Sequence, residues 1–461
     1  MTTTILRDIA YLVTMDDASR ELTGVDLAVS GNRIEAVGKG LKAGPETEIV
    51  DASNLIVTPG LVNAHQHLYQ IGMRSITELE RARIHPWLNG LHVKTHYWWK
   101  QGYYTPETVG AVAAAGMVES LLGGVTTVAD QHYVFPGGTT EPYIESMIEG
   151  AHETGIRLHA GRGSMTKGRA KGGVVPDQAC QTVDEVLRHS LELIEKYHDP
   201  DPTAQIRIDL APCGVHTDEP ELFQEFARIA SENSGVGLHT HLYEVIDTEY
   251  CKNTYDVTPW GFLGKNGWHD RRVWLAHMVD PPEEEIPEFA EVGVGIVHLI
   301  APDLRMGFGL APLRKYLDAG CKVGFGTTGS ASNDGANQLG DLRIAALVHR
   351  LPDAPTSKWP TARELLKLAT RGSAECLGRE TLGVIAPGMT ADLAAWDMST
   401  VDRVGIHDPV VGLLLAGLSD RANLVMVNGE ILVRDSQCLK VDEQVIAEAA
   451  RNAFPPRPIR G

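Results

Sequence analysis

VTPGLVNAHQHLYQ, residues 57–70, is the stretch on which the interpretation of the whole chain depends. The apolar run that leads into it breaks at Pro59-Gly60, and a second short strand-like run follows and ends in His65-Gln66-His67. Alternate residues of a β-strand point to the same face, so the two imidazoles are expected to converge. Converging neutral imidazoles are typical ligands of Zn²⁺ or Fe²⁺. The stretch therefore predicts a strand that ends at a metal site.

The His-x-His pattern alone does not establish that site. With 18 His among 461 residues, chance gives about 0.7 such pairs. The alternative interpretation is a pair of polar residues at the end of a strand. The rest of the chain has to distinguish the two.

The composition is that of a globular protein, with 43% hydrophobic and 22% charged residues and a net charge of −19. A surface this acidic argues against nucleic acid and anionic membranes as partners. The six cysteines are scattered without a CxxC pair, which favours reduced thiols and a cytoplasmic location. No signal-peptide pattern is visible at the N-terminus, and the apolar stretch at residues 410–418 is too short to cross a membrane.

Two kinds of pattern divide the chain. Residues 1–58 and 383–461 consist of short β-type runs separated by Gly and Asn turns, and we expect them to pair into one composite β-sandwich domain. Residues 59–382 alternate apolar runs with helical stretches, the pattern of a parallel sheet. The apolar runs lie at residues 60–64, 124–129, 156–160, 206–211, 236–241, 273–277, 294–299 and 322–326.

The eight repeats predict the fold class: α/β, with a (β/α)₈ TIM barrel over residues 59–382. The helices expected between or after the strands cover residues 107–122, 141–153, 183–197, 220–232 and 362–376. A doubly wound sheet is the alternative. The sequence has no GxGxxG after the first strand, which argues against a dinucleotide-binding sheet.

Polar side chains recur where the apolar runs end, and histidine is present at seven of the eight ends. In a barrel these ends form one mouth, where such enzymes place their active sites. A random distribution would instead scatter histidines over surface loops. The residues concerned are His65, His67, Asp130, Gln131, His132, His159, Arg162, Cys213, His216, His239, His241, Glu244, His277, His298, Thr327, Thr328 and Ser330.

The segment GLHTHLYE, residues 237–244, is the second candidate part of the site. His239 and His241 share a strand face, and we favour His241 as a ligand because it lies nearer the mouth. Glu244 follows in the loop, where a carboxylate can exchange protons with a water molecule or a substrate ring nitrogen. A solvated loop glutamate is the alternative. His277 closes the buried run RVWLAHMV and is either a core histidine or part of the site.

Together these motifs resemble the metal-dependent amidohydrolase superfamily. PGLVNAHQH, HTHLYE, the His of LAH, GTTGSASNDG at residues 326–335 and GVIAPGMTADL carry the resemblance. Within the superfamily the chain is similar to the branch of triazine hydrolases, chlorohydrolases and aminohydrolases that act on nitrogen heterocycles. The resemblance implies that His65, His67 and His241 bind the metal and that Glu244 is the proton donor. It implies that His277 either completes the coordination or holds the nucleophilic water.

One position departs from the common pattern of the superfamily, in which an Asp follows the eighth strand. Here Thr328 stands in its place, and a hydroxyl is neither a base near pH 7 nor an anionic ligand. An amine must gain a proton to leave, whereas chloride departs as an anion. We therefore expect this exchange to impair deamination more than dechlorination, with Thr328 as part of the catalytic site.

The resulting functional prediction is a metal-dependent hydrolase that displaces chloride, an S-alkyl group or a similar leaving group from an s-triazine-like ring by a metal-activated hydroxide. It would use one divalent ion, Zn²⁺ or else Fe²⁺, act on a small heterocyclic substrate and form a homodimer. Trp87 and Gln131 are the predicted substrate-binding residues, against the alternative that they are core residues.

Two alternative functions remain at this point. One is an aminohydrolase of a purine or pterin such as guanine, 8-oxoguanine or isoxanthopterin. The other is a non-catalytic scaffold of the same fold, against which the retained histidines and Glu244 argue.

Overall fold

The computed structural model describes residues 3–416 and 421–454. The end of the apolar stretch predicted at residues 410–418 lies outside these ranges, as do the ends of the predicted terminal segments. Within the described residues, no helix combines the length and the apolar character that crossing a bilayer requires.

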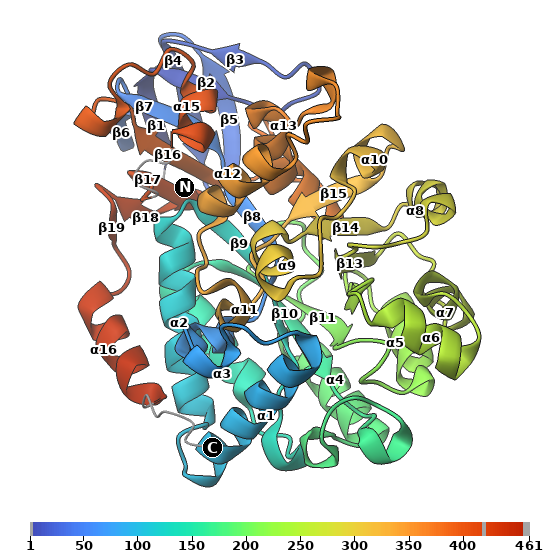
Figure 1. Cartoon of the computed structure of the whole chain (residues 1–461). Coiled ribbons are helices and arrows are strands. Elements are labelled where there is room, and N and C mark those ends of the chain that lie inside the picture. Colours follow the sequence, from blue (N-terminus) through green and yellow to red (C-terminus); the bar gives the residue numbers. More distant parts are fainter. Residues whose placement is uncertain (1–2, 417–420, 455–461) are drawn as a thin grey trace.

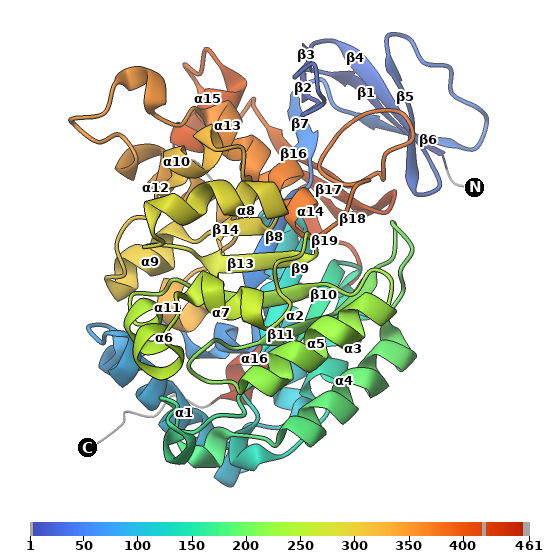
Figure 2. The same ribbon diagram turned by 90° about the vertical axis from the view of Figure 1, so that its right-hand side faces the viewer.

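Eight parallel strands form a barrel in the order of the sequence (Figures 1 and 2). Backbone N–H groups of Thr327 and Thr328 donate to the carbonyl of His65, which joins the last strand to the first. The strands are β8 (Leu61–Gln66), β9 (Val125–His132), β10 (Arg157–Ser164), β11 (Ile206–Pro212), β12 (Leu238–Leu242), β13 (Val273–His277), β14 (Gly295–His298) and β15 (Lys322–Phe325). All eight lie where the apolar runs predicted them, so the predicted α/β fold class with a (β/α)₈ barrel is confirmed.

Helices surround the barrel, and the five predicted from the sequence are all present. The segment 362–376 is interrupted by a π-helical turn, Leu368–Gly372, between α13 and α14. The helices are α1 (Ile84–Lys100), α2 (Pro106–Leu122), α3 (Tyr143–Thr154), α4 (Val183–Tyr197), α5 (Pro220–Glu232), α6 (Asp247–Tyr255), α7 (Pro259–Lys265), α8 (Ile286–Val292), α9 (Ile300–Met306), α10 (Leu313–Asp318), α11 (Ser330–Asn333), α12 (Gln338–Val348), α13 (Ala362–Lys367), α14 (Ser373–Cys376), α15 (Pro409–Leu415) and α16 (Glu443–Ala453).

Local sequence explains where several helices begin. Thr182 opens α4 with a capping box, in which its hydroxyl accepts from the Glu185 N–H and the Glu185 carboxylate accepts from the Thr182 N–H. Thr105 and Thr361 begin α2 and α13 in the same way. Each box satisfies N–H groups that the first turn of a helix leaves unpaired.

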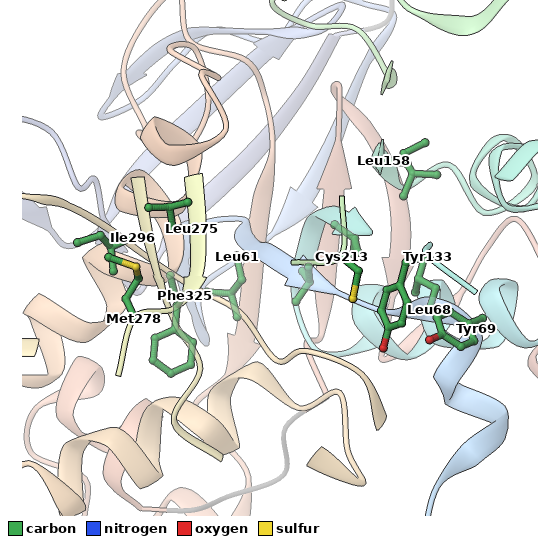
Figure 3. Packing of buried hydrophobic residues seen from close by; sticks show 14 of the residues in the cluster. Leu61, Leu68, Tyr69, Tyr133, Leu158, Cys213, Leu275, Met278, Ile296 and Phe325 are labelled. Atoms are coloured by element: carbon green, nitrogen blue, oxygen red, sulfur yellow. The ribbon is translucent and has the colours of Figure 1, made fainter. Parts of the chain in front are cut away.

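The barrel strands pack through both faces. On β13, Leu275 belongs to the large cluster between strands and helices, whereas Trp274 and Ala276 belong to a smaller second cluster. Figure 3 shows Leu275 gathered with Ile296 and Phe325 from the neighbouring strands. This alternation follows the two-residue period of a strand, and it assigns His239 to the inner face, where its ring stacks on Trp274 at 4.8 Å.

The N- and C-terminal segments build two further sheets, which lie beside the barrel (Figures 1 and 2). One sheet has the order β5-β4-β1-β6 and the other β19-β18-β17-β16-β7-β2-β3. Residues such as Leu6, Leu27, Val57 and Leu393 share one buried cluster between them, which is the predicted composite β-sandwich. Strand bounds are β1 (Thr3–Ile9), β2 (Tyr11–Val13), β3 (Glu21–Leu22), β4 (Val25–Ser30), β5 (Arg33–Gly38), β6 (Thr47–Asp51), β7 (Leu55–Pro59), β16 (Leu393–Asp397), β17 (Leu424–Val427), β18 (Glu430–Arg434) and β19 (Gln437–Cys438).

The N-terminal and C-terminal segments pair directly within this sandwich. Strand β7 pairs antiparallel with β16, with Leu393 opposite Pro59. The Asn428-Gly429 turn connects β17 to β18, and both of its residues have positive φ angles, as a type I′ turn requires. Beyond the sandwich, α16 packs against α2 on the barrel (Figure 1). The division at residues 58 and 382 stays a prediction.

Candidate metal centre and active site

Three imidazoles meet at the mouth of the barrel. His65 lies on β8, His67 follows directly after it, and His241 lies on β12. One ligand atom of each falls within 4.8 Å of the others, and all three residues are buried. The Nε2 atoms of His67 and His241 are 3.3 Å apart.

Backbone carbonyls fix the tautomers of two of these rings. His67 Nδ1 lies 2.8 Å from the Gln131 carbonyl oxygen, and His241 Nδ1 lies 2.6 Å from the Cys213 carbonyl oxygen. A carbonyl oxygen only accepts hydrogen bonds, so both Nδ1 atoms carry the proton. Each Nε2 is therefore left with its lone pair directed toward the other.

A second histidine fixes the tautomer of His65. His239 donates from Nδ1 to the Trp274 carbonyl at 2.7 Å, so its Nε2 is an acceptor. His65 Nδ1 lies 2.7 Å from that Nε2 and must donate to it. The Nε2 of His65 is then also free of a proton. His239 thus supports His65 from beneath, whereas His241, on the same strand face, reaches the centre.

Burial keeps these rings neutral. It lowers the pKa of His67 to about 3 and the pKa values of His65 and His241 well below the usual value, and neighbouring imidazoles lower the pKa values of His65 and His241 further. Three lone pairs that face one another without a proton repel, and a cation is their electrostatic complement. The donor set therefore fits a divalent metal ion.

A buried chain of three groups lies beside the imidazoles. His277, at the end of β13, has its Nε2 3.2 Å from Glu244 Oε1 and its Nδ1 2.6 Å from Asp303 Oδ1 on α9. Burial raises the pKa of Glu244. Burial lowers the pKa of His277, but the Asp303 and Glu244 carboxylates outweigh it, so the net direction is upward. The ring of His277 lies 5.4 Å from that of His241, and His277 is outside the three-imidazole group.

Thr328 completes the surroundings of the centre. Its hydroxyl oxygen is 3.0 Å from His65 Nε2, and its N–H donates to the His65 carbonyl at 2.9 Å. The φ angle of Thr328 is 50°, an outlier for a β-branched residue. Tyr243 and His277, which follow or close neighbouring strands, also have positive φ angles of 56° and 73°. These three positions near the ends of barrel strands thus carry backbone strain of about 1–3 kcal/mol each.

A pocket with about 440 Å³ of empty space opens onto these groups. Trp87 forms part of its wall, and its indole N–H donates to the Ala331 carbonyl at 3.2 Å. Gln131 does not line the pocket, because its amide donates to the carbonyls of Ala211 and Pro212. The lining residues are His67, Ile84, Trp87, Leu88, Tyr133, Cys213, His216, His241, Glu244, His277, Pro302, Met306, Phe308, Thr328 and Ser332. A larger hollow of about 880 Å³ beside α2 and α16 is lined by other residues and shares none with this pocket.

Several strand-end histidines do not reach this point, contrary to the expectation that all would share one mouth. His159 lies low on β10, where its Nδ1 is 2.7 Å from Asp209, and it accepts from Arg379. The ring of His298 faces that of His349, with their Nε2 atoms 3.0 Å apart. Parity and height on the strand separate these residues from the site, and neither follows from the position of a run in the sequence.

Sequence reasoning missed two acidic members of the site. Asp303 lies 26 residues beyond His277, on the helix after the next strand, and no local pattern connects the two. Asp247 accepts from the Glu244 N–H and from His216 Nδ1. Its spacing of three residues after Glu244, at the start of a helix, is the signal that would have drawn attention to it.

Comparison with known proteins agrees with this geometry. Residues 56–432 match the model of the amidohydrolase family. The crystal structure of atrazine chlorohydrolase from Arthrobacter aurescens TC1 complexed with zinc is 52% identical, with a TM-score of 0.96 over 98% of this chain and 100% of that one. Among curated relatives, 8-oxoguanine deaminase of Pseudomonas aeruginosa is 37% identical over 88% of each chain. Hydroxydechloroatrazine ethylaminohydrolase of Pseudomonas sp. (strain ADP) is 31% identical over 98% of this chain and 95% of that relative.

The residues that match the family model include the barrel, the imidazole group and the sandwich strands β16 and β17. Relatives that act on small heterocycles are aligned along nearly the full length of the chain. The chain therefore belongs to the amidohydrolase family and is a metal-dependent hydrolase.

Proposed function

We propose that this protein hydrolytically displaces chloride, an S-alkyl group or a similar leaving group from an s-triazine-like ring. The observation that carries the proposal is the hydroxyl of Thr328 beside His65, in a chain that is 52% identical to atrazine chlorohydrolase across its length. Within the described residues, the ligand group around His65 contains no carboxylate. The ligand group itself thus offers no carboxylate that could take a proton from water and return it to a departing amine.

His65, His67 and His241 are the residues that would hold one Zn²⁺ ion. Their three unprotonated Nε2 atoms match the nitrogen ligands that zinc accepts. When bound, the ion lowers the pKa of a water molecule so that a nucleophile is available near neutral pH. The carbonyls of Gln131 and Cys213 keep two of the rings in orientation by accepting from Nδ1.

Glu244 is the proposed proton donor. Burial raises its pKa, which retains a proton on the carboxyl group at higher pH than for an exposed glutamate. As a nucleophile adds to the ring carbon, negative charge develops on a ring nitrogen, and Glu244 can neutralise it by transferring that proton. Its position in the pocket wall, beside His241, allows contact with a ring held there.

His277 has an orienting role in this proposal. Asp303 accepts from Nδ1 at 2.6 Å, which fixes the ring, and Nε2 is directed to Glu244. Because both nitrogens have partners outside the imidazole trio, we favour the role of holding the attacking water and Glu244 in place over that of a fourth ligand. Asp303 acts through His277 and is a positioning residue.

The pocket wall suits a flat neutral ring with alkyl substituents. Ile84, Trp87, Leu88, Met306 and Phe308 supply apolar and aromatic surface opposite the polar groups. Trp87 is the proposed substrate-contacting residue. Gln131, also predicted to bind substrate, is proposed instead to act through His67, which donates to its backbone carbonyl.

A panel of leaving groups on one ring tests the proposal. Zinc-loaded protein is incubated with triazines that carry chloride, S-methyl, methoxy or amino groups at the same carbon, and each released product is quantified. Faster release of chloride or thiolate than of ammonia supports the proposal. Exclusive release of ammonia would overturn it.

Deamination of a purine or pterin is the second candidate, and the 37% identity to 8-oxoguanine deaminase favours it. Both reactions would use the same centre and proton donor. The same panel extended with guanine, 8-oxoguanine and isoxanthopterin distinguishes them, because ammonia release from these rings at rates above chloride release from triazines identifies a deaminase.

We further propose a cytoplasmic homodimer in which residues 1–58 with 383–461 form one domain and residues 59–382 the other. The six cysteines are free thiols, which supports a reducing location. The shared core of the two terminal segments supports the domain division. Light scattering coupled to gel filtration tests the dimer, and limited proteolysis tests the domain boundaries.

A further inference from the structure

A second cluster of potential metal ligands lies in the same pocket and shares no residue with the imidazole trio. It consists of His216 after β11, Glu244 after β12 and Asp247 at the start of α6. One ligand atom of each lies within 4.8 Å of the others. Their exposed fractions are only 2%, 7% and 1%, so the cluster is part of the interior and not a solvated acidic patch.

The cluster places two carboxyl groups beside one imidazole. Two carboxylates lie within 4.8 Å of each other in a buried site, where like charges repel strongly. Asp280 lies close enough that Asp247, together with burial, raises its pKa. His216 is the imidazole of the cluster, with its Nδ1 2.9 Å from Asp247 Oδ1.

Glu244 and His216 are the members of the cluster that line the pocket. The Oε1 atom of Glu244 faces His277 at 3.2 Å. The Glu244 side chain is more than nine-tenths buried and forms part of the pocket wall. A largely buried carboxylate in a pocket wall is expected to bind a cation or a polar group of the substrate.

The distances suit a transition-metal ion. Zinc binds nitrogen and carboxylate oxygen at about 2.0–2.2 Å, which separates two ligands of one ion by roughly 3–3.5 Å. The 2.9 Å between His216 and Asp247 is close to that separation, so an ion can take the place of the proton they share with little movement. One imidazole with two carboxylates favours Zn²⁺, Co²⁺ or Mn²⁺ over Mg²⁺, which prefers oxygen ligands and water.

We propose that His216, Glu244 and Asp247 form a second, inhibitory site for a divalent transition-metal ion. An ion there binds the carboxylate of Glu244 and prevents it from carrying a proton to the substrate. It also occupies pocket volume that the substrate ring needs. Excess metal therefore switches the enzyme off. The inhibitory part of this inference rests on the proposed role of Glu244, whereas the binding part does not.

Metal stoichiometry tests the binding part. The purified protein is dialysed against buffers of rising free Zn²⁺ and its metal content is measured by elemental analysis. The expected curve has two steps, a tight first equivalent and a weaker second one. The rate of chloride release from a chlorotriazine, measured under the same conditions, is expected to rise with the first step and to fall with the second.

Two variants assign the second step to the cluster. His216→Gln and Asp247→Asn each remove one ligand while retaining a hydrogen-bonding side chain. Each is expected to weaken the second step by at least about 10–100-fold, the usual effect of disturbing a metal site, without removing the first step. Activity is normalised to the maximum of each variant, so that only the zinc concentration of half-inhibition is compared. His152→Gln, at an exposed histidine on α3, is the matched control and should leave both steps unchanged.

The outcomes separate this inference from the proposed function. A wild-type curve that ends after one equivalent, or a second step unchanged in both variants, overturns the second site. A second step that appears without loss of activity overturns the inhibitory role. If no tight first equivalent binds, or if His65→Ala and His241→Ala retain it, the proposed function fails instead. Co²⁺ in place of Zn²⁺ provides an absorption signal for each step.

Discussion

The carboxyl group of Glu244 illustrates how the surroundings set the chemistry of one residue. It is buried next to Asp247 and His277, and burial raises its pKa. Replacement by glutamine keeps the volume and the polar character but removes the transferable proton. General acid–base groups contribute about 10²–10⁴-fold to rate, so Glu244→Gln is expected to lower turnover by that factor. Elemental analysis should show unchanged content of the tightly bound metal ion.

The control for this substitution is Glu249→Gln, because Glu249 is exposed on α6. It should behave like the wild type. Retention of more than half of the turnover in Glu244→Gln would contradict the role of proton donor.

Thr328 is the residue on which the preference for a leaving group depends. Its left-handed backbone is tolerated better by Asp than by Thr, so Thr328→Asp should fold. The new carboxylate beside His65 supplies a base that can return a proton to a departing amine. The ratio of ammonia release to chloride release is expected to rise at least about tenfold, corresponding to about 1.4 kcal/mol between the two barriers.

Thr328→Ser keeps the hydroxyl and should leave that ratio unchanged. Competition between amino- and chlorotriazine substrates in one vessel measures the ratio without an active-site titration. An equal ratio in Thr328→Asp and the wild type would show that this position does not select the leaving group.

Asp341, on α12, links a single residue to the pH dependence of stability. Burial raises its pKa to about 7, although Asn333 donates to the carboxylate and lowers the pKa in part. In the unfolded chain an aspartate has a pKa of about 3.9. Between these pH values the folded protein binds more protons than the unfolded chain, so this group makes the free energy of unfolding fall as pH rises.

Asp341→Asn should remove that fall. The variant is expected to be about 1–3 kcal/mol more stable than the wild type at pH 8 and to show no such advantage below pH 4. Chemical denaturation at both pH values measures the difference. Asp353→Asn, at an exposed site, is the control. A variant that is less stable than the wild type at pH 8 would contradict the buried-carboxylate account.

At the scale of elements, the C-terminal helix supports the segment that follows the metal ligands. Phe454, just after α16, stacks on Trp98 at 4.9 Å and on Tyr104 at 5.5 Å. Gly72, in the 3₁₀ turn Leu68–Met73 after His67, has no side chain, and a Cβ there would lie 2.2 Å from the Phe454 ring. Packing of Phe454 therefore connects α16 to the turn that follows His67.

Phe454→Ala is expected to destabilise the protein by about 3 kcal/mol, within the range for loss of a buried aromatic ring. Hydrogen exchange should show faster opening of α16 and of the Leu68–Met73 turn than in the wild type. Val445→Ala, on the exposed side of the same helix, should leave both unchanged. Faster exchange of α16 without any change at the turn would contradict the proposed coupling.

At the scale of the whole molecule, the barrel holds the imidazoles in place through strands that are packed on both faces. Removal of metal by a chelator is therefore expected to abolish turnover while the far-ultraviolet circular dichroism stays the same. The thermal midpoint should fall, because an ion that binds only the folded state stabilises it. Adding one equivalent of Zn²⁺ should restore both turnover and midpoint. Full turnover in protein shown to be free of metal would contradict a metal-dependent reaction.

Periodicity along the chain was sufficient to predict the eight barrel strands. Each strand carries its own signal, because a strand buried on both faces appears as a continuous apolar run between helices. The same locality explains why α4 and α5 could be bounded exactly: a capping Thr182 precedes α4 and a proline opens α5. The π-helical turn at Leu368–Gly372 had no such signal, since the close approach of Gly372 to Val323 depends on the neighbouring strand.

The candidate site could be predicted only in part. His65 and His67 belong to one His-x-His motif and His241 belongs to a second, and within each motif the spacing places both histidines on the same strand face. The structure brings the nitrogens of His65, His67 and His241 together. Asp303 could not be found, because its contact with His277 joins two elements whose relative height is set by packing. For the same reason the sequence could not separate His159, at the bottom of the barrel, from histidines at its mouth.

The sequence by itself determined which segments become strands and helices, and which histidines lie on the same face of a strand. Those properties depend on neighbours within a few residues, through backbone geometry and alternating burial. Only the tertiary structure decided the tautomers, the pKa directions and the pairing of His277 with Asp303 and of His216 with Asp247. These depend on desolvation and on contacts between residues from different strands and helices, which exist only after the barrel has closed.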